Sequence, residues 1–260
     1  MNGTAWLGAL GTVALLVFAA AHYGAQLLLA NGVALLFVVG GIAASCLLGF
    51  PLSRLASALR RAWALFFAAG LPTEQEAVQE ILRLARIAQS QGGLLALARE
   101  NLTFADGFLM RAVLAAVSTG DAQETRHMVE REIRKRRIQA EEDANVFRTV
   151  GVLSPMFGLL GTLLGMIRLM SIMQNPAQAG PAMAVALASA FFGICVANFV
   201  CVPVAGHMRL RAIEELVILD TLLEGVLDLL SSKPPAYISV HLTGTAERRR
   251  EQARAQAVPA

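Results

Sequence analysis

The chain has 260 residues, of which 56% are hydrophobic and 16% charged, and its mean hydropathy is +0.57. These values exclude an ordinary soluble domain, in which about 25% of residues are charged, and they indicate an integral membrane protein. The net charge is only +3, and the 22 basic residues are interleaved with 19 acidic ones without an aromatic platform, so no nucleic-acid partner is predicted.

Four apolar stretches qualify as membrane-crossing helices, since a hydrocarbon core about 30 Å thick needs about 20 helical residues. They are residues 6–21, 28–50, 150–173 and 182–205. The first is short and resembles a signal peptide, but no basic residue precedes it, so we predict a retained helix. A soluble bundle of buried helices is the alternative. It is disfavoured because apolar residues cover all faces of these stretches.

The distribution of basic residues predicts the orientation in the membrane. Fourteen lysines and arginines lie between Arg54 and Arg148, and seven lie beyond His207. The loops at residues 22–30 and 174–181 carry no charge. The positive-inside rule therefore places both charged segments and both termini in the cytoplasm.

A helical cytoplasmic insert is predicted between the second and third spans. Residues 52–67 combine arginines with apolar residues at helical spacing, which is typical of a helix at the inner membrane surface. Thr73 and Glu76 form a capping box that starts the next helix. Further helices are expected at residues 94–102, 108–117 and 122–147. No Pro or Gly interrupts residues 121–150, so the last of these helices is expected to continue into the third span.

After the fourth span we expect a separate amphipathic helix at residues 208–231, ended by Pro234 and Pro235, and then a polar tail from Thr243. The predicted fold is an all-α membrane protein with four transmembrane helices, a helical cytoplasmic insert and a cytoplasmic C-terminal helix. Its domains are residues 1–50 with the first two spans, 51–147 with the insert, 148–205 with the last two spans, and 206–260 with the C-terminal helix and tail.

Small residues form matching stripes on the third and fourth spans. They recur at i, i+3, i+4 and i+7, which is one face of a helix. The stripes consist of Gly158, Gly161, Thr162 and Gly165 on the third span, and of Ala186, Ser189, Ala190, Gly193 and Ala197 on the fourth. Close helix packing without any chemistry is one interpretation. An ion pathway is the other, because the mid-span hydroxyl of Thr162 would suit a passing ion, although bonding to its own helix would also explain it.

Polar features inside the spans are few. Pro155 and Pro203 each remove a backbone donor and are predicted to allow helix bends near the cytoplasmic ends of their spans. Arg168, the only charge inside a span, is expected to extend to the outer interface. None of the 19 carboxylates lies in a span, although proton pathways usually need an ionisable group in the membrane. If the protein conducts ions, a partner helix must supply the carboxylate.

An enzyme, a metal site and a cofactor are not predicted. The sequence contains no GxxxxGK[ST], HExxH or GxSxG motif, and its four histidines are scattered over different segments. Cys46, Cys195 and Cys201 lie in apolar spans without the spacing of a zinc site or a disulfide framework. We expect them to be small core residues.

The segments SPMFGLLGTLLGMIRLM and GPAMAVALASAFFGICVANFVCVPVA, separated by a short uncharged loop, resemble the MotA/TolQ/ExbB proton-channel family. The chain is also similar to the MotA branch of this family upstream, in the segments GIAASCLLGFPL, GLLALARENLTFADGFL and STGD. The presence of two predicted spans before the insert fits the MotA branch too. The resemblance implies a flagellar stator subunit of the bacterial inner membrane. It implies a homo-pentamer around single-span MotB-like partners, each with one intramembrane Asp, that couples proton flow to torque. The stripe residues would then line the ion pathway and face the partner.

The resemblance also implies an ion and a rotor contact. Sodium-using members tend to carry threonine where this chain has Ala190, so protons are predicted, with Ser189 keeping sodium as the less expected ion. A FliG-like rotor protein would contact charged residues near GLLAL, where the usual charge pair is missing. The charged residues that would take the place of this pair are Arg86, Arg99 and Glu100. The alternative interpretation is that all three are solvated surface charges. Two other functions stay open: a TolQ/ExbB-type energiser of an envelope machine, and a non-conducting membrane scaffold.

Overall fold

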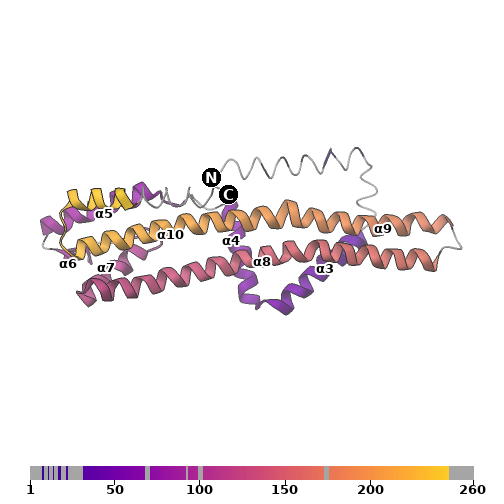
Figure 1. The fold of residues 1–260 in the computed structure, drawn as a ribbon, viewed down its shortest axis with the longest axis horizontal. Coiled ribbons are helices and arrows are strands. Elements are labelled where there is room, and N and C mark those ends of the chain that lie inside the picture. The colour runs from indigo at the N-terminus through magenta and orange to yellow at the C-terminus, as the bar shows by residue number, and fades with distance from the viewer. Residues whose placement is uncertain are drawn as a thin grey trace, which may run out of the picture. The chain divides into compact units, whose positions relative to one another are not determined.

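The computed structural model describes residues 8, 11, 14, 17, 18, 22, 32–67, 71–91, 93–98, 102–172 and 176–245. All regular elements in these ranges are helices (Figure 1). Most of the first predicted span and the tail beyond residue 245 lie outside the described residues. The chain divides into two compact units. We call Met1–Gly70 with Ala140–Leu210 the membrane unit, and Leu71–Gln139 with Arg211–Ala260 the bundle unit.

Three described helical segments are long and apolar enough to cross a membrane: Gly32–Gly49, Ala122–Ser171 and Ala179–Leu230. The first is α3 (Gly32–Gly49), which matches the second predicted span. The second is α8 (Ala122–Ser171), a single helix of 50 residues. It continues without a break from the helix predicted at residues 122–147 into the third predicted span, as the absence of Pro and Gly from residues 121–150 predicts, and it also includes Pro155. At 1.5 Å per residue α8 is about 75 Å long, more than twice the thickness of a hydrocarbon core.

The fourth span continues directly into the C-terminal helix. α9 (Pro176–Cys195) is followed by the π-helical segment η1 (Val196–Cys201) and by α10 (Val202–Leu230). The prediction of a separate helix from residue 208 is therefore wrong. The N–H of Val202 donates to the carbonyl of Ala197, so helical bonding continues up to Pro203, whose ring has no N–H to donate.

The bundle unit begins as the sequence predicts. In the capping box before α5 (Glu74–Gln91), Thr73 N–H donates to Glu76 Oε2 at 2.8 Å, and Glu76 N–H donates to Thr73 Oγ1 at 3.2 Å. α6 (Leu94–Leu97) is shorter than the helix predicted at residues 94–102.

Before α7 (Phe108–Thr119), Gly107 has φ +72°. That angle lies in the left-handed region, which glycine adopts readily because it has no Cβ.

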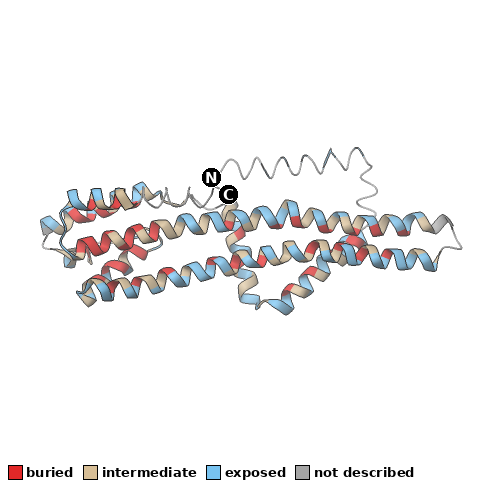
Figure 2. Ribbon diagram, viewed as in Figure 1, coloured by how far each residue is buried: buried red, intermediate tan, exposed pale blue. Residues whose placement is uncertain are grey.

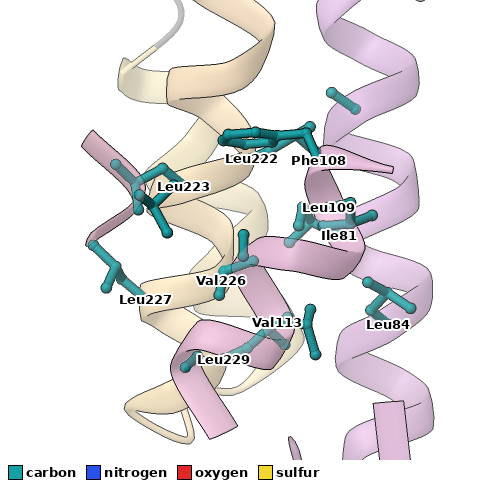
Figure 3. Packing of buried hydrophobic residues seen from close by; sticks show 14 of the residues in the cluster. Ile81, Leu84, Phe108, Leu109, Val113, Leu222, Leu223, Val226, Leu227 and Leu229 are labelled. Atoms are coloured by element: carbon teal, nitrogen blue, oxygen red, sulfur yellow. The ribbon is translucent and has the colours of Figure 1, made fainter. Parts of the chain in front are cut away.

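A dense apolar core holds the bundle unit together (Figure 3). Phe108 and Leu109 of α7 pack with Ile81 of α5 and with the buried face of α10. Gly225 of α10 allows the closest approach, since a Cβ there would lie 2.7 Å from Ile81 Cγ1. Figure 2 shows this core as a concentration of buried residues in α5, α7 and the second half of α10. By contrast, the helices of the membrane unit expose many large apolar side chains.

A second helix follows α10 and was not predicted. Residues 235–245 are helical, and Pro235 stands in the first turn of this helix, where proline is favoured. α10 itself ends before the prolines, with Ser232 at φ +53° and the N–H of Lys233 donating to the carbonyl of Asp228. Ile238 and Leu242 are fully buried in the bundle core, and His241 Nδ1 lies 2.7 Å from Asp228 Oδ2. These contacts explain why Thr243 is helical rather than the start of a polar tail.

Candidate functional site

The two stripes of small residues meet in the contact between α8 and α9. A Cβ on Gly193 would lie 2.5 Å from the carbonyl oxygen of Ser154 and 3.0 Å from Gly158 Cα. Further along the contact, a Cβ on Gly161 would lie 2.5 Å from Ser189 Cβ. Gly193 and Gly161 must both be glycine for the helices to approach this closely, as in small-residue packing elsewhere in membranes.

Most of the stripe is buried by this contact within a single chain. The buried members are Gly158, Gly161, Gly165, Ala186, Ser189, Gly193 and Ala197. Only Thr162 and Ala190 are half-exposed. The glycines are therefore used to pack α8 against α9, rather than left open as a smooth wall for a partner. This is a correction to the partner-facing role that the resemblance implied for them.

α3 covers one flank of the α8–α9 pair. Phe37 of α3 lies beside Gly161, where a Cβ would be 3.5 Å from its Cδ1. The ring of Phe157 of α8 occupies the space beside Gly41 of α3. Val38, Ile42 and Cys46 of α3 form a cluster with Phe157 of α8, and the cluster also includes Val196 of η1.

Thr162 and Ala190 border the flank that α3 leaves open. Successive helical residues are about 100° apart around the axis. Thr162 is therefore rotated by one step from Gly161, toward the flank opposite Phe37, and the step from Ser189 places Ala190 on that same flank. The apolar residues around them are exposed: Leu159 and Met166 on α8, Leu187 and Ile194 on α9. Among the described residues, this face is exposed and apolar, and it contains the hydroxyl of Thr162.

The hydroxyl groups of this region bond to their own helices. Thr162 Oγ1 donates to the carbonyl of Leu159 at 2.6 Å, and Ser189 Oγ donates to that of Val185 at 2.9 Å. Bonding of Thr162 to its own helix is therefore confirmed. The oxygen of Thr162 keeps lone pairs that can accept a hydrogen bond from water or from a protonated carboxyl group.

The other predicted residues are not gathered at this face. Pro155 and Pro203 stand within continuous helices, and the bends expected there stay predictions. Arg168 is exposed in the last turn of α8. Arg86 is exposed on α5, whereas Arg99 and Glu100 lie outside the described residues. In the described ranges, no group of three or more His, Cys, Asp or Glu side chains is placed to hold a metal ion.

Sequence reasoning missed a buried carboxylate, Asp143 of α8, which is only 4% exposed. Its Oδ1 accepts a hydrogen bond from Ser57 Oγ at 2.7 Å, and its Oδ2 lies 3.1 Å from Arg61 Nε. Both partners belong to α4 (Leu52–Phe67), and a second ion pair joins Arg54 of α4 to Glu142 at 2.9 Å. Asp143 is one of several charges in a run typical of a solvated face, so the pattern alone gave no signal.

Replacing Asp143 with alanine is expected to detach α4 from α8, because Ser57 and Arg61 lose a nearly buried acceptor, a loss that typically costs about 1–3 kcal/mol. The measurement is the thermal stability of the detergent-solubilised chain. Glu142→Ala is the control, since its partner Arg54 is more than a third exposed and such pairs contribute little. An equal loss in both variants would contradict a special role for Asp143.

Comparisons with known proteins agree with this architecture. The MotA/TolQ/ExbB proton channel family matches residues 100–220. The chain is 29% identical to the chemotaxis protein PomA of Vibrio alginolyticus, over 91% of this chain and 92% of PomA. It is 28% identical to motility protein A of Treponema pallidum, over 93% of each chain.

A solved structure has the same fold. The flagellar MotAB stator complex from Bacillus subtilis contains a chain that matches with a TM-score of 0.83 at 24% identity, covering 97% of this chain and all of that one. The matched family segment contains α7, most of α10 and both helices of the small-residue contact. The chain is therefore similar to the MotA/TolQ/ExbB proton channel family over residues 100–220, and to motility proteins over nearly its whole length.

Proposed function

We propose that this protein is the ion-conducting subunit of a flagellar stator, which works with a MotB-like single-span partner and couples proton flow across the inner membrane to torque on a rotor. The proposal is carried by one observation: a chain that is similar to a proton channel family has no carboxylate anywhere in residues 144–213. Proton transfer through a membrane needs an ionisable group, so a partner helix supplies an aspartate. The relatives named as motility proteins, and the MotAB complexes of similar fold, support a MotB-like partner.

The proposed assembly is a homo-pentamer surrounding the partner helices, with both termini and the bundle unit in the cytoplasm. The positive-inside rule supports this orientation, because the basic residues flank the spans on the side of the bundle unit. The bundle unit would contact a FliG-like rotor protein, and exposed Arg86 is the described candidate for that contact.

The face containing Thr162 and Ala190 is the proposed partner-facing surface. It is the flank of α8 and α9 that α3 does not cover, and its small and apolar side chains allow an apolar helix to lie against it. Thr162 would accept a hydrogen bond from the partner's protonated aspartic acid. We propose protons rather than sodium as the ion, because a dehydrated cation requires several oxygen ligands and the half-exposed positions supply one hydroxyl.

Ion pairs within the bundle unit support transmission of force along α8. Arg126 of α8 donates to both carboxylate oxygens of Glu224 on α10, at 2.8 and 3.0 Å, and these hydrogen bonds raise the pKa of the guanidinium above its usual value. Arg136 reaches Glu215 of α10 at 3.1 Å. Two ion pairs thus join α8 to α10 within this unit.

Reconstitution into vesicles tests the proposal. The chain alone is expected to give no proton flux under an applied potential, whereas co-purification with a single-span partner that carries an intramembrane Asp is expected to give flux. Changing that Asp to Asn in the partner should abolish it. Sustained flux through the chain alone, or flux that depends on sodium rather than on protons, would contradict the corresponding part of the proposal.

Thr162→Val is expected to reduce proton flux at least tenfold while the complex still assembles, because valine keeps the shape and removes the accepting oxygen. Ser154→Ala is the matched control. Its hydroxyl also bonds to its own helix, at Val150, but it is fully buried in the α8–α9 contact. Flux in the complex is measured with a pH-sensitive dye. If Thr162→Val conducts like the wild type, Thr162 has no part in conduction.

A further inference from the structure

One side of α4 is fixed by the rest of the membrane unit. Ala58 and Ala62 are buried, and Arg54 and Arg61 are engaged by Glu142 and Asp143 of α8. These contacts lie on the same side of α4 and determine which of its residues point away from α8. The orientation of the opposite side is therefore set by the fold and not by free rotation of the helix.

The opposite side of α4 presents large apolar residues and one cation. Leu52, Leu59 and Trp63 are 71%, 66% and 66% exposed, and their spacing of i, i+7 and i+11 places them on one face. Arg60 is exposed beside this face. In the part of the chain that the structure describes, Arg60 forms no ion pair, unlike the other two arginines of α4.

The position of α4 in the chain identifies what covers this face. Only Phe50 and Pro51 separate α4 from α3, and the end of α3 exposes Leu47 and Leu48 as a membrane-crossing helix does. The exposed face of α4 thus continues the lipid-facing surface of α3 at the level where hydrocarbon gives way to headgroups. Tryptophan and arginine are typical of this level, and a cation there attracts anionic lipids.

We propose that α4 forms a binding site for anionic phospholipids, in which Leu52, Leu59 and Trp63 insert among the acyl chains and Arg60 binds the phosphate-containing headgroup. The inference rests on the proposed function only in assigning the site to the cytoplasmic leaflet of the membrane. Because Ser57 and Arg61 of α4 bind Asp143 of α8, the bound lipid contacts a helix that is joined directly to the one that carries Gly158, Gly161, Thr162 and Gly165.

The fluorescence of Trp63 tests this site in the full-length chain. The chain has two tryptophans, so Trp6→Phe leaves Trp63 as the single reporter. The protein is placed in nanodiscs of phosphatidylglycerol and phosphatidylcholine at one fixed ratio, with dibrominated acyl chains on either lipid in turn. Quenching by both is expected, and brominated phosphatidylglycerol is expected to quench about twofold more than its mole fraction predicts.

Arg60→Gln is expected to remove the excess quenching by phosphatidylglycerol and to leave the quenching by phosphatidylcholine, whereas Arg60→Lys should retain the excess. Arg134→Gln, which removes an exposed arginine from the bundle unit, is the matched control and should change nothing. No quenching by either lipid would overturn the proposal in favour of a protein partner on this face. Equal quenching in the wild type would overturn the headgroup site. Since the assay needs no partner and no ion flux, its failure is distinct from failure of the proposed function.

Discussion

Gly193→Ala is expected to disrupt the contact between α8 and α9, although it is the smallest possible substitution. The new Cβ would lie 2.5 Å from the carbonyl oxygen of Ser154 and 3.0 Å from Gly158 Cα. Both are backbone atoms, so no side chain can move aside. Overpacking of this kind costs about 1–3 kcal/mol, which exceeds the gain of about 1 kcal/mol from replacing glycine with alanine in a helix.

The measurement is the melting temperature of the purified chain in detergent, together with recovery of the complex with its partner. Gly180→Ala is the matched control, because it makes the same change in the same helix with nothing within 4 Å of the new Cβ. Gly180→Ala should melt at or above the wild-type temperature, whereas Gly193→Ala should melt several degrees lower. Two indistinguishable variants would show that α8 and α9 do not pack through their glycines.

Phe108→Ala is expected to destabilise the bundle unit by about 3–5 kcal/mol. Phe108 is fully buried between α5 and α10 (Figure 3), and its removal leaves a large cavity. The variant also loses the contact of its ring with the guanidinium of Arg136, whose carbon lies 5.6 Å from the ring centroid. Such a contact contributes about 0.5–1 kcal/mol at a partly exposed site.

Unfolding in urea, followed by far-ultraviolet circular dichroism and by limited proteolysis of the bundle unit, measures this loss in the full-length chain. Leu114→Ala in α7 is the control, because Leu114 is 44% exposed and its truncation leaves no enclosed cavity. A loss below about 1 kcal/mol for Phe108→Ala would mean that the core closes around the missing ring. The comparison of the two variants separates cavity formation from a general effect of alanine in α7.

Much of the architecture could be predicted from local patterns in the sequence. The helix of the second predicted span, the capping box before α5 and the unbroken continuation of the helix at residues 122–147 into the third predicted span are confirmed. Each depends on residues close together in the chain, where helical spacing and capping are decisive.

The features that could not be predicted depend on residues far apart in the chain. The helix at residues 235–245 forms because Ile238 and Leu242 find places in the bundle core. Asp143 is buried only because Ser57 and Arg61 approach it from α4.

The stripe illustrates the same limit. Its spacing was read correctly, but only tertiary contacts separate Gly158, which packs within the chain, from Thr162, which borders an open face.

The π-helical segment η1 changes the angular position, around the helix axis, of the residues that follow it. A π-helix closes its hydrogen bonds over one residue more than an α-helix does, so η1 holds one residue in excess of regular α-helical winding. Deleting a residue between Val196 and Cys201 would restore regular winding and turn everything downstream by about 100° relative to α9. The six residues therefore act as an angular offset, which fixes the side on which the first part of α10 presents buried Met208 once the side on which α9 presents Ser189 is set.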